Sequence, residues 1–178
     1  MYYKTTYSSP LGTLTLACNS GALVGLWIDG QKYHGESYMP EMKANNNEPI
    51  FNAAKKWLDR YFAGKNPSSN ELLLAPAGSA FRQDVWRILC EIPYGKVISY
   101  GGIAKNLAAK MNAGMSSQAV GGAVGHNPIS IIIPCHRVVG SSGSLTGYAG
   151  GLDAKVKLLE LEGADMSRLF VPKKGTAL

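Results

Sequence analysis

The chain has little cysteine and no long apolar run. Its three cysteines, Cys18, Cys90 and Cys135, are an odd number without C-x-x-C spacing, which argues against a disulfide framework and a zinc cluster. No apolar stretch approaches the roughly 18–20 residues that a membrane-spanning helix needs. The first residues also lack the apolar core of a signal peptide. We therefore expect a cytoplasmic protein with free thiols and no membrane partner.

Charged side chains are also sparse, and they are unevenly distributed. They make up 17% of the 178 residues, with a net charge of +6. Residues 1–78 hold seven Lys/Arg against six Asp/Glu, whereas residues 79–178 hold eleven against six. A basic second half favours a polyanionic partner such as nucleic acid, although a solvated basic surface gives the same composition.

The first part of the chain predicts an antiparallel β-meander followed by a helix. Runs rich in Thr, Val, Leu and aromatic residues alternate with turn signals such as Ser8-Ser9-Pro10 and Asn19-Ser20-Gly21. The expected strands are residues 2–7, 12–17 and 22–28. Residues 35–49 are polar and predict a loop. Apolar residues then recur every three or four positions over 50–62, which predicts an amphipathic helix that ends before Gly64.

A linker rich in proline, serine and glycine, residues 64–78, predicts a domain boundary. We expect an N-terminal domain of residues 1–78 and a C-terminal domain of residues 79–178. The second domain begins with a predicted helix over 80–91, for which Ser79 is the expected N-cap. A final helix is predicted from about 152 to 162, with Gly163 as its stop.

Two short helices joined by a glycine-containing turn predict a helix-turn-helix. The first spans 100–110 after the cap residue Ser99, the turn lies at 112–114, and the second, which Ser116 or Ser117 can cap, runs through Gly125. The second helix has no charge and three glycines, each of which weakens a helix by roughly 0.8–1 kcal/mol relative to alanine. Close helix packing explains such glycines, and so does a backbone that approaches the floor of a DNA minor groove.

A thiol stands directly before an imidazole and a guanidinium in the run Ile133-Pro134-Cys135-His136-Arg137. The apolar residues 129–133 predict a strand leading to it. Cysteine is a strong nucleophile only as its thiolate, and a neighbouring base or positive charge lowers its pKa toward that form. Since neighbours in sequence need not touch, the run by itself leaves a structural role for His136 open.

Six segments share the second domain in a fixed order. They are Val97-Ile98-Ser99-Tyr100, Ala119-Val120-Gly121, Asn127-Pro128, Pro134-Cys135-His136-Arg137, Gly147-Tyr148 and Glu162-Gly163. In this order and spacing they closely resemble the methylated-DNA–protein-cysteine methyltransferases, also called 6-O-alkylguanine-DNA alkyltransferases. The resemblance is strong from about residue 81 to 163, and the N-terminal half matches mainly in its pattern of a small sheet, a helix and a linker.

The resemblance implies an α+β fold and direct-reversal DNA repair. A small N-terminal antiparallel β-sheet with a helix, a ribonuclease-H-like remnant, would precede a mostly helical domain with a winged-helix-like helix-turn-helix. Such proteins bind double-stranded DNA in the minor groove and flip the alkylated guanine out of the stack. They transfer the alkyl group from the 6-oxygen, or from the 4-oxygen of alkylated thymine, to their own cysteine. The thioether product has no good leaving group, so each molecule acts once.

The resemblance also assigns catalytic roles. Cys135 would be the alkyl acceptor, His136 the base acting through a water, and Glu162 the group that orients the imidazole. Asn127 would brace the turn before the active-site strand. Tyr100 would crowd the 3′ phosphate to promote rotation of the nucleotide and would donate to the leaving guanine.

Binding residues follow from the same resemblance. Tyr148 would line the guanine pocket with backbone groups of Val138 and Ala149. The expected DNA contacts are Tyr100, Gln118, Ala119, Gly122, Gly125 and Ser141. Gln118 stands where the family usually has an arginine that replaces the extruded base, and glutamine offers no cation to the base stack. We therefore expect weaker DNA binding or slower flipping. The partner would be duplex DNA with alkylated guanine, bound by a monomer without cofactor or metal.

Two other functions use parts of the same pattern. A non-catalytic helix-turn-helix protein for lesion recognition or regulation would bind DNA without reacting, but the presence of Cys135 disfavours it. A cysteine hydrolase built on Cys135 and His136 would leave the helix-turn-helix without a role. The pattern does not indicate which size of alkyl group is preferred.

Overall fold

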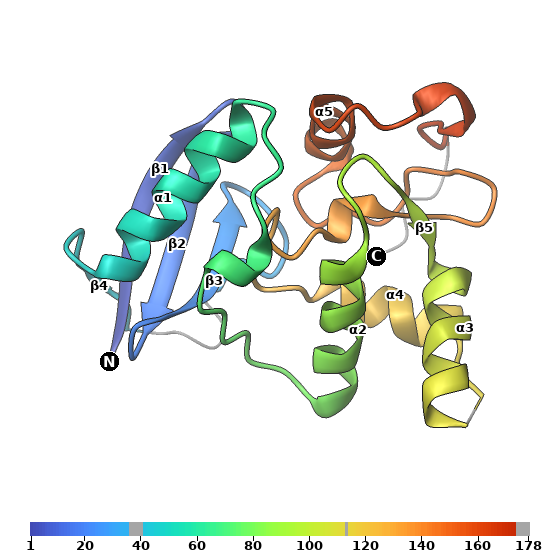
Figure 1. The fold of residues 1–178 in the computed structure, drawn as a ribbon, viewed down its shortest axis with the longest axis horizontal. Helices are drawn as coiled ribbons and strands as arrows, with labels where there is room; N and C mark the ends of the chain where they lie inside the picture. The colour runs from blue at the N-terminus through green and yellow to red at the C-terminus, as the bar shows by residue number, and fades with distance from the viewer. Residues whose placement is uncertain (36–40, 113, 174–178) are drawn as a thin grey trace. The chain divides into compact units, whose positions relative to one another are not determined.

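Residues 1–35, 41–112 and 114–173 are described by the computed structural model, and they fall into two units. The first unit comprises Met1–Ala77 and Pro128–Ile132, and the second comprises Gly78–Asn127 and Ile133–Leu178. Figure 1 traces the chain through both. The first unit thus includes a short segment that returns from late in the sequence, which no local pattern indicates.

The three predicted strands form an antiparallel sheet in the first unit. They are β1 (Tyr2–Ser9), β2 (Gly12–Asn19) and β3 (Ala22–Ile28), and β1 also pairs in parallel with a two-residue strand, β4 (Lys43–Ala44). The strand order is β3-β2-β1-β4. Strand β4 lies in the segment predicted as a loop, because two exposed residues are too few to produce a recognisable alternation. Residues 36–40 of that segment lie outside the described residues.

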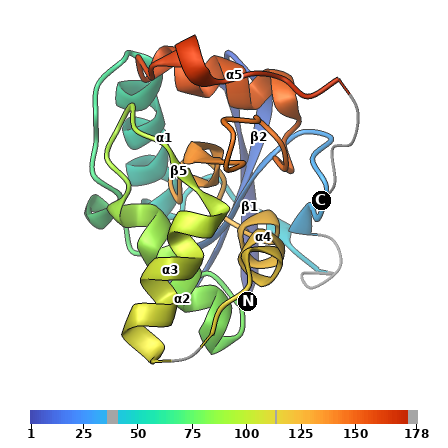
Figure 2. The same cartoon turned by 90° about the vertical axis from the view of Figure 1, so that its right-hand side faces the viewer.

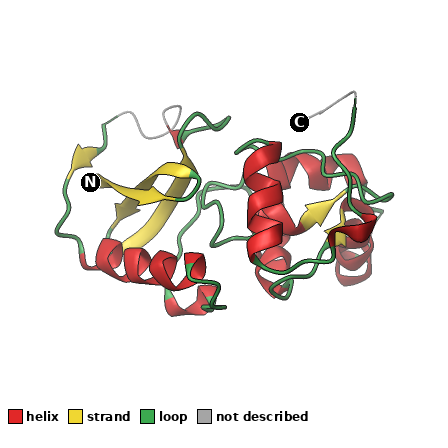
Figure 3. Ribbon diagram, turned by 90° about the horizontal axis from the view of Figure 1, so that it is seen from above, coloured by secondary structure: helices red, strands yellow, loops and turns green. Residues whose placement is uncertain are grey.

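One helix covers a face of this sheet. Helix α1 (Pro49–Phe62) begins at a proline in its first turn, where the missing N–H costs no hydrogen bond. It contacts all three long strands, and Figure 3 shows it along one side of the sheet. Its buried residues are Ile50, Phe51, Ala54, Trp57, Leu58 and Tyr61, which confirms the predicted amphipathic face. A short 3₁₀ helix, η2 (Ser69–Glu71), follows in the linker.

Residues 129–133 do not form the predicted strand. Only Ile129 pairs, in a single parallel bridge with Leu26, whose N–H and carbonyl bond Pro128 and Ser130 at 2.9 Å each. The chain then turns, and Ile131 has φ 71°, in the left-handed region that β-branched residues avoid. The prediction was wrong because a short buried apolar run has no periodicity that separates a strand from a buried turn.

Three helices organise the second unit. They are α2 (Ala80–Glu91), α3 (Tyr100–Met111) and α4 (Ser117–Gly125), and their N-caps Ser79, Ser99 and Ser116 each accept a hydrogen bond from a backbone N–H in the first turn. Helix α2 packs on both α3 and α4, and the Trp86 indole donates to the Ala123 carbonyl at 2.9 Å. Figure 2 shows these helices together.

Helices α3 and α4 form the predicted helix-turn-helix. Helix α3 ends at Asn112, which has φ 49°, a left-handed conformation that asparagine adopts more readily than most residues. Ala113 of the predicted turn lies outside the described residues. Helix α4 then begins at the cap Ser116 and packs against α3.

A short pair of parallel strands positions the remaining elements of the second unit. Strand β5 (Ile98–Ser99) pairs with β6 (Val138–Val139), which follows the 3₁₀ helix η3 (Cys135–Arg137) directly. The pairing brings the start of α3, at Tyr100, to the segment that follows Cys135. Helix α5 (Leu152–Leu161) contacts η3 and is followed by Gly163 at φ 67° and by η4 (Met166–Arg168).

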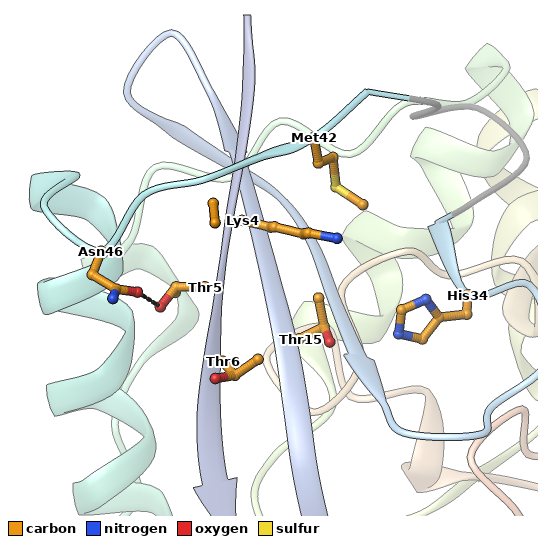
Figure 4. Close-up of a pocket in the computed structure, with 8 residues that line it drawn as sticks. Lys4, Thr5, Thr6, Thr15, His34, Met42 and Asn46 are labelled. Carbon is orange, nitrogen blue, oxygen red and sulfur yellow. Dashed lines mark hydrogen bonds between the residues drawn. The ribbon is translucent and has the colours of Figure 1, made fainter.

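A pocket of about 260 Å³ lies in the first unit, on strands β1 and β2. Figure 4 shows its lining, which comprises Lys4, Thr5, Thr6, Thr15, His34, Met42, Ala44 and Asn46. The Thr5 hydroxyl donates to the Asn46 side-chain oxygen at 2.6 Å. None of the sequence-predicted site residues lines this pocket. Within the described ranges, every helix is too short or too polar to cross a bilayer.

Candidate active site

Three consecutive side chains leave η3 in three directions. A 3₁₀ helix has three residues per turn, so neighbouring side chains point about 120° apart. Cys135 bonds to Asn127, whereas His136 and Arg137 both bond to Glu162. All three residues of η3 are buried. The sequence run is therefore divided into a thiol with an amide donor and a pair of basic groups on one carboxylate.

The Cys135 thiol is held by Asn127. The side-chain amide of Asn127 donates to Sγ at 3.1 Å and to the Ile133 carbonyl at 2.8 Å. Burial raises the pKa of Cys135, and the Asn127 hydrogen bond and the Lys155 charge lower it by less. The free protein thus favours the thiol, and the thiolate needs a base to form. Asn127 thus bonds both to the turn before η3 and to the sulfur.

A single buried carboxylate gathers the surrounding donors. Glu162 accepts hydrogen bonds from His136 Nε2 at 2.7 Å, from Arg137 Nε at 2.8 Å and Nη2 at 3.0 Å, and from the Gly95 N–H at 3.1 Å. Burial by itself favours the neutral acid. The hydrogen bonds and charges of His136 and Arg137 outweigh burial and hold the pKa of Glu162 well below its usual range. Glu162 is therefore a carboxylate at neutral pH.

The ionised carboxylate determines the tautomer of His136. Because Glu162 can only accept, His136 Nε2 carries the proton, and Nδ1 carries the lone pair. Burial lowers the pKa of His136, and the nearby carboxylate opposes that effect without overcoming it. The imidazole is thus neutral and oriented, which is the form required of a general base.

A turn that the sequence does not connect to the site braces Glu162 from the other side. Arg137 Nη1 donates to the Ile92 carbonyl at 2.6 Å, and its guanidinium lies 5.7 Å from the centre of the Tyr94 ring. Gly95 has φ 72°, and a Cβ there would lie 2.6 Å from the Glu162 carbonyl oxygen. Proline and glycine at 93 and 95 do indicate a turn, but its partner lies 67 residues away in sequence.

The residues expected to bind the guanine lie beside the His136–Glu162 pair. Tyr148 is buried, with its ring centre 6.4 Å from that of His136 and the ring planes 83° apart. Val138 is buried and Ala149 is partly buried. The Tyr100 hydroxyl donates to the carbonyls of Thr146 and Gly147 at 3.2 and 3.3 Å. Burial, together with Cys135, raises the pKa of Tyr100 to about 12, so its phenol stays a donor.

Most of the expected DNA-contact residues are on the surface of the second unit. Gln118, Ala119 and Gly122 are exposed on α4, and Ser141 is exposed in the loop after β6. Gly125 differs from this expectation, because it is buried at the end of α4, where the chain enters its buried stretch at Asn127. Its backbone is not part of the exposed face of the helix.

One buried group was missed by sequence reasoning altogether. Lys155 is fully buried on α5, although lysines in an amphipathic pattern are ordinarily assigned to the surface. No local signal distinguishes it from Lys157, which is exposed two residues later. Among the described residues, no group of three His, Cys, Asp or Glu side chains is arranged to hold a metal ion.

A buried thiol beside a histidine–carboxylate relay, in a unit built on a helix-turn-helix, defines a protein that combines a cysteine nucleophile with a DNA-binding fold. Family models agree with this class over nearly the whole chain. The ribonuclease-like domain of 6-O-methylguanine DNA methyltransferase matches residues 2–76, and its DNA binding domain matches residues 80–164. The chain belongs to the 6-O-methylguanine DNA methyltransferase family.

Individual relatives match over similar lengths. A methylated-DNA–protein-cysteine methyltransferase of Haemophilus influenzae is 42% identical, covering 90% of this chain and 86% of its own length. One of Methanosarcina acetivorans is 43% identical, covering 92% and 99%. The crystal structure of Mycobacterium tuberculosis O6-methylguanine methyltransferase has a TM-score of 0.78 at 41% identity, covering 98% of this chain and 97% of that one. The same organism's OGT in complex with DNA has a TM-score of 0.75 at 41% identity, covering 94% of each.

Replacing Glu162 by Gln tests the buried carboxylate. The pKa of Glu162 is lower in the folded than in the unfolded protein, so its contribution is complete above about pH 4.3, the unfolded value, and is lost as the pH falls below it. We expect Glu162→Gln to lower the free energy of unfolding by about 3–5 kcal/mol at pH 7. The difference from wild type should shrink toward pH 3. Urea denaturation at several pH values measures it.

Glu160→Gln is the matched control, because Glu160 is an exposed carboxylate in the last turn of α5, two residues before Glu162. Its free energy of unfolding should stay within about 0.5 kcal/mol of wild type at every pH. A Glu162→Gln difference that is equal at pH 3 and pH 7 would show that the ionised carboxylate is not what stabilises the site.

Proposed function

We propose that this protein repairs alkylated guanine in double-stranded DNA by transferring the alkyl group from the 6-oxygen to Sγ of its own Cys135, once per molecule. The observation that carries the proposal is the arrangement around η3. Asn127 donates to the thiol, and His136 and Arg137 share the carboxylate of Glu162. Curated relatives at 42–43% identity are named methylated-DNA–protein-cysteine methyltransferases. We place the reaction in the cytoplasm, where reducing conditions keep the thiol free.

The chemistry follows from the protonation states. The thiol proton passes to Nδ1 of His136 through a water, and Glu162 stabilises the imidazolium that forms. The thiolate attacks the alkyl carbon, the carbon–oxygen bond breaks, and its electron pair goes to the guanine. Tyr100, which stays protonated, donates a hydrogen bond to the leaving base. The new carbon–sulfur bond is a thioether that no group in the site can cleave.

The composition of α4 supports DNA binding rather than helix packing. A Cβ at Gly122 would meet no atom within 4 Å, and one at Gly121 would lie at an ordinary contact distance of 3.9 Å from the Tyr100 ring. The fold therefore has room for alanine at both positions. Something outside the protein must require the absence of side chains, and a minor groove that lies against α4 does so. Gln118, exposed at the start of this helix, would contact the gap left by the flipped nucleotide.

Alkylation of Cys135 is tested by intact-protein mass spectrometry. Wild-type protein is incubated with a duplex oligonucleotide that contains one 6-O-methylguanine. We expect a gain of one methylene unit, located on the peptide that contains Cys135, and no gain in Cys135→Ala. Cys90→Ala is the control for a second, partly exposed thiol and should gain the group as wild type does. A folded wild-type protein that binds this duplex and gains no mass would instead indicate a non-catalytic lesion-recognition protein.

Replacing Gly122 by Ala separates the two explanations of the glycine-rich helix. Since the space is open, we expect Gly122→Ala to raise the free energy of unfolding by about 0.5–1 kcal/mol. Its affinity for duplex DNA, measured by fluorescence anisotropy, should fall, while its reaction with free 6-O-benzylguanine stays at the wild-type rate. Unchanged duplex affinity would mean that α4 does not lie against the DNA.

A further inference from the structure

Lys155 is a buried cation to which the proposed chemistry assigns no role. It lies on α5 with an exposed fraction of 0%. Its ammonium donates to the Val138 carbonyl at 2.5 Å and to the Thr146 carbonyl at 2.9 Å. Burying a lysine is costly unless its charge and its protons are satisfied, and these two bonds offset part of that cost. They do not account for why a charge is there.

The two carbonyls belong to the two segments that line the proposed guanine pocket. Val138 follows η3 directly, and Thr146 lies two residues before Tyr148. Gly147, between Thr146 and Tyr148, has φ 76°, a conformation that other residues rarely adopt. Lys155 therefore ties the segment after the alkyl acceptor to the loop that presents the pocket tyrosine. Since α5 also contacts η3, the helix that carries Lys155 is also the helix that supports Cys135.

Thr146 has a second donor, and this donor is expected to leave. The Tyr100 hydroxyl also donates to the Thr146 carbonyl, at 3.2 Å. In the structure, the Tyr100 hydroxyl, which we propose donates to the guanine, is thus hydrogen-bonded to the pocket loop. When Tyr100 turns to a bound base, Thr146 loses that bond, and only Lys155 of the two donors still holds its carbonyl. A part-buried carbonyl left without any donor would destabilise the pocket loop.

The charge of Lys155 acts on the thiol as well. Lys155 and Tyr100 are the ionisable groups that interact with Cys135, and Glu162, Arg137 and Lys155 act on the adjacent His136. The negative charge of Glu162 is balanced by the positive charge of Arg137, and His136 is neutral. Burial lowers the pKa of Lys155 to about 8, and a negative charge on Cys135 raises it. In the other direction, the charge of Lys155 lowers the pKa of Cys135, so ammonium and thiolate stabilise each other.

We propose that Lys155 is a positioning residue for alkyl transfer: its ammonium keeps the carbonyls of Val138 and Thr146 in place when Tyr100 moves to the substrate, and its charge stabilises the Cys135 thiolate. The inference rests on the proposed function. It assigns the buried cation two tasks, and each has its own readout. The first is coupling to Tyr100, and the second is the pH dependence of the reaction.

The experiment compares Lys155→Met and Lys155→Arg with Lys157→Met, a matched control that removes an exposed lysine from the same helix. The rate of Cys135 alkylation is followed by intact mass from pH 6 to 9. One substrate is a 6-O-methylguanine duplex and the other is free 6-O-benzylguanine. We expect Lys155→Met to react roughly 10–100-fold more slowly with both, with its pH–rate curve shifted to higher pH. Lys155→Arg keeps the charge and should restore the position of that curve below about pH 8, where Lys155 is itself charged. Lys157→Met should match wild type.

Coupling to Tyr100 is measured with Tyr100→Phe, Lys155→Met and the double variant. Because both side chains donate to Thr146, the loss of thermal stability in the double variant should exceed the sum of the two single losses. If the two single losses add up to the loss in the double variant, the shared carbonyl does not couple Tyr100 and Lys155. Should Lys155→Met fail to fold, Lys155→Arg decides: a folded arginine variant with a shifted pH–rate curve contradicts the role of the charge.

The outcomes separate this inference from the proposed function. If wild type is alkylated while Lys155→Met retains the wild-type pH–rate curve, Lys155 is a structural residue only, and the repair function stands. If wild type is not alkylated by either substrate, the proposed function fails, and the role of Lys155 in it fails too.

Discussion

The ionised carboxylate of Glu162 is the constraint on which the rest of the site depends. It is buried, so it stays ionised only because His136, Arg137 and the Gly95 N–H donate hydrogen bonds to it. Its charge in turn fixes which nitrogen of His136 carries the proton. Arg137 Nη1 donates to the Ile92 carbonyl, which links the end of α2 to the end of α5. Removing the carboxylate would take away the acceptor that Arg137 Nε and Nη2 share with His136 Nε2.

The thiol stands at the junction of this relay and the helix-turn-helix. Asn127, which follows α4, donates to Cys135, and Tyr100, which begins α3, bonds to the pocket loop. Helix α4, which carries the exposed residues that we propose to contact DNA, thus leads to Asn127, and α3 begins at Tyr100. Burial keeps the thiol protonated until a substrate and its base act together, which protects a nucleophile that is used once.

Local features of the fold were predictable, and contacts between distant segments were not. The three long strands, the helices and the caps Ser79, Ser99 and Ser116 follow from periodicity and capping, which are short-range effects. Cys135, His136 and Glu162 were identified by resemblance, and in the structure His136 bonds to Glu162 while Cys135 bonds to Asn127. The burial of Lys155, the bracing turn at Gly95 and the failure of the 129–133 strand depend on partners far away in sequence, so no local pattern contains them.

We propose that Cys135 is an acceptor consumed in one turnover, because no described group around it can cleave a thioether. The most direct measurement is a titration of a fixed amount of protein with increasing amounts of 6-O-methylguanine duplex, in which the repaired guanine is counted at completion. Our account predicts a plateau at one repaired guanine for each molecule of protein. Repair that continues beyond that ratio would contradict it, because the thiol would then have to be regenerated.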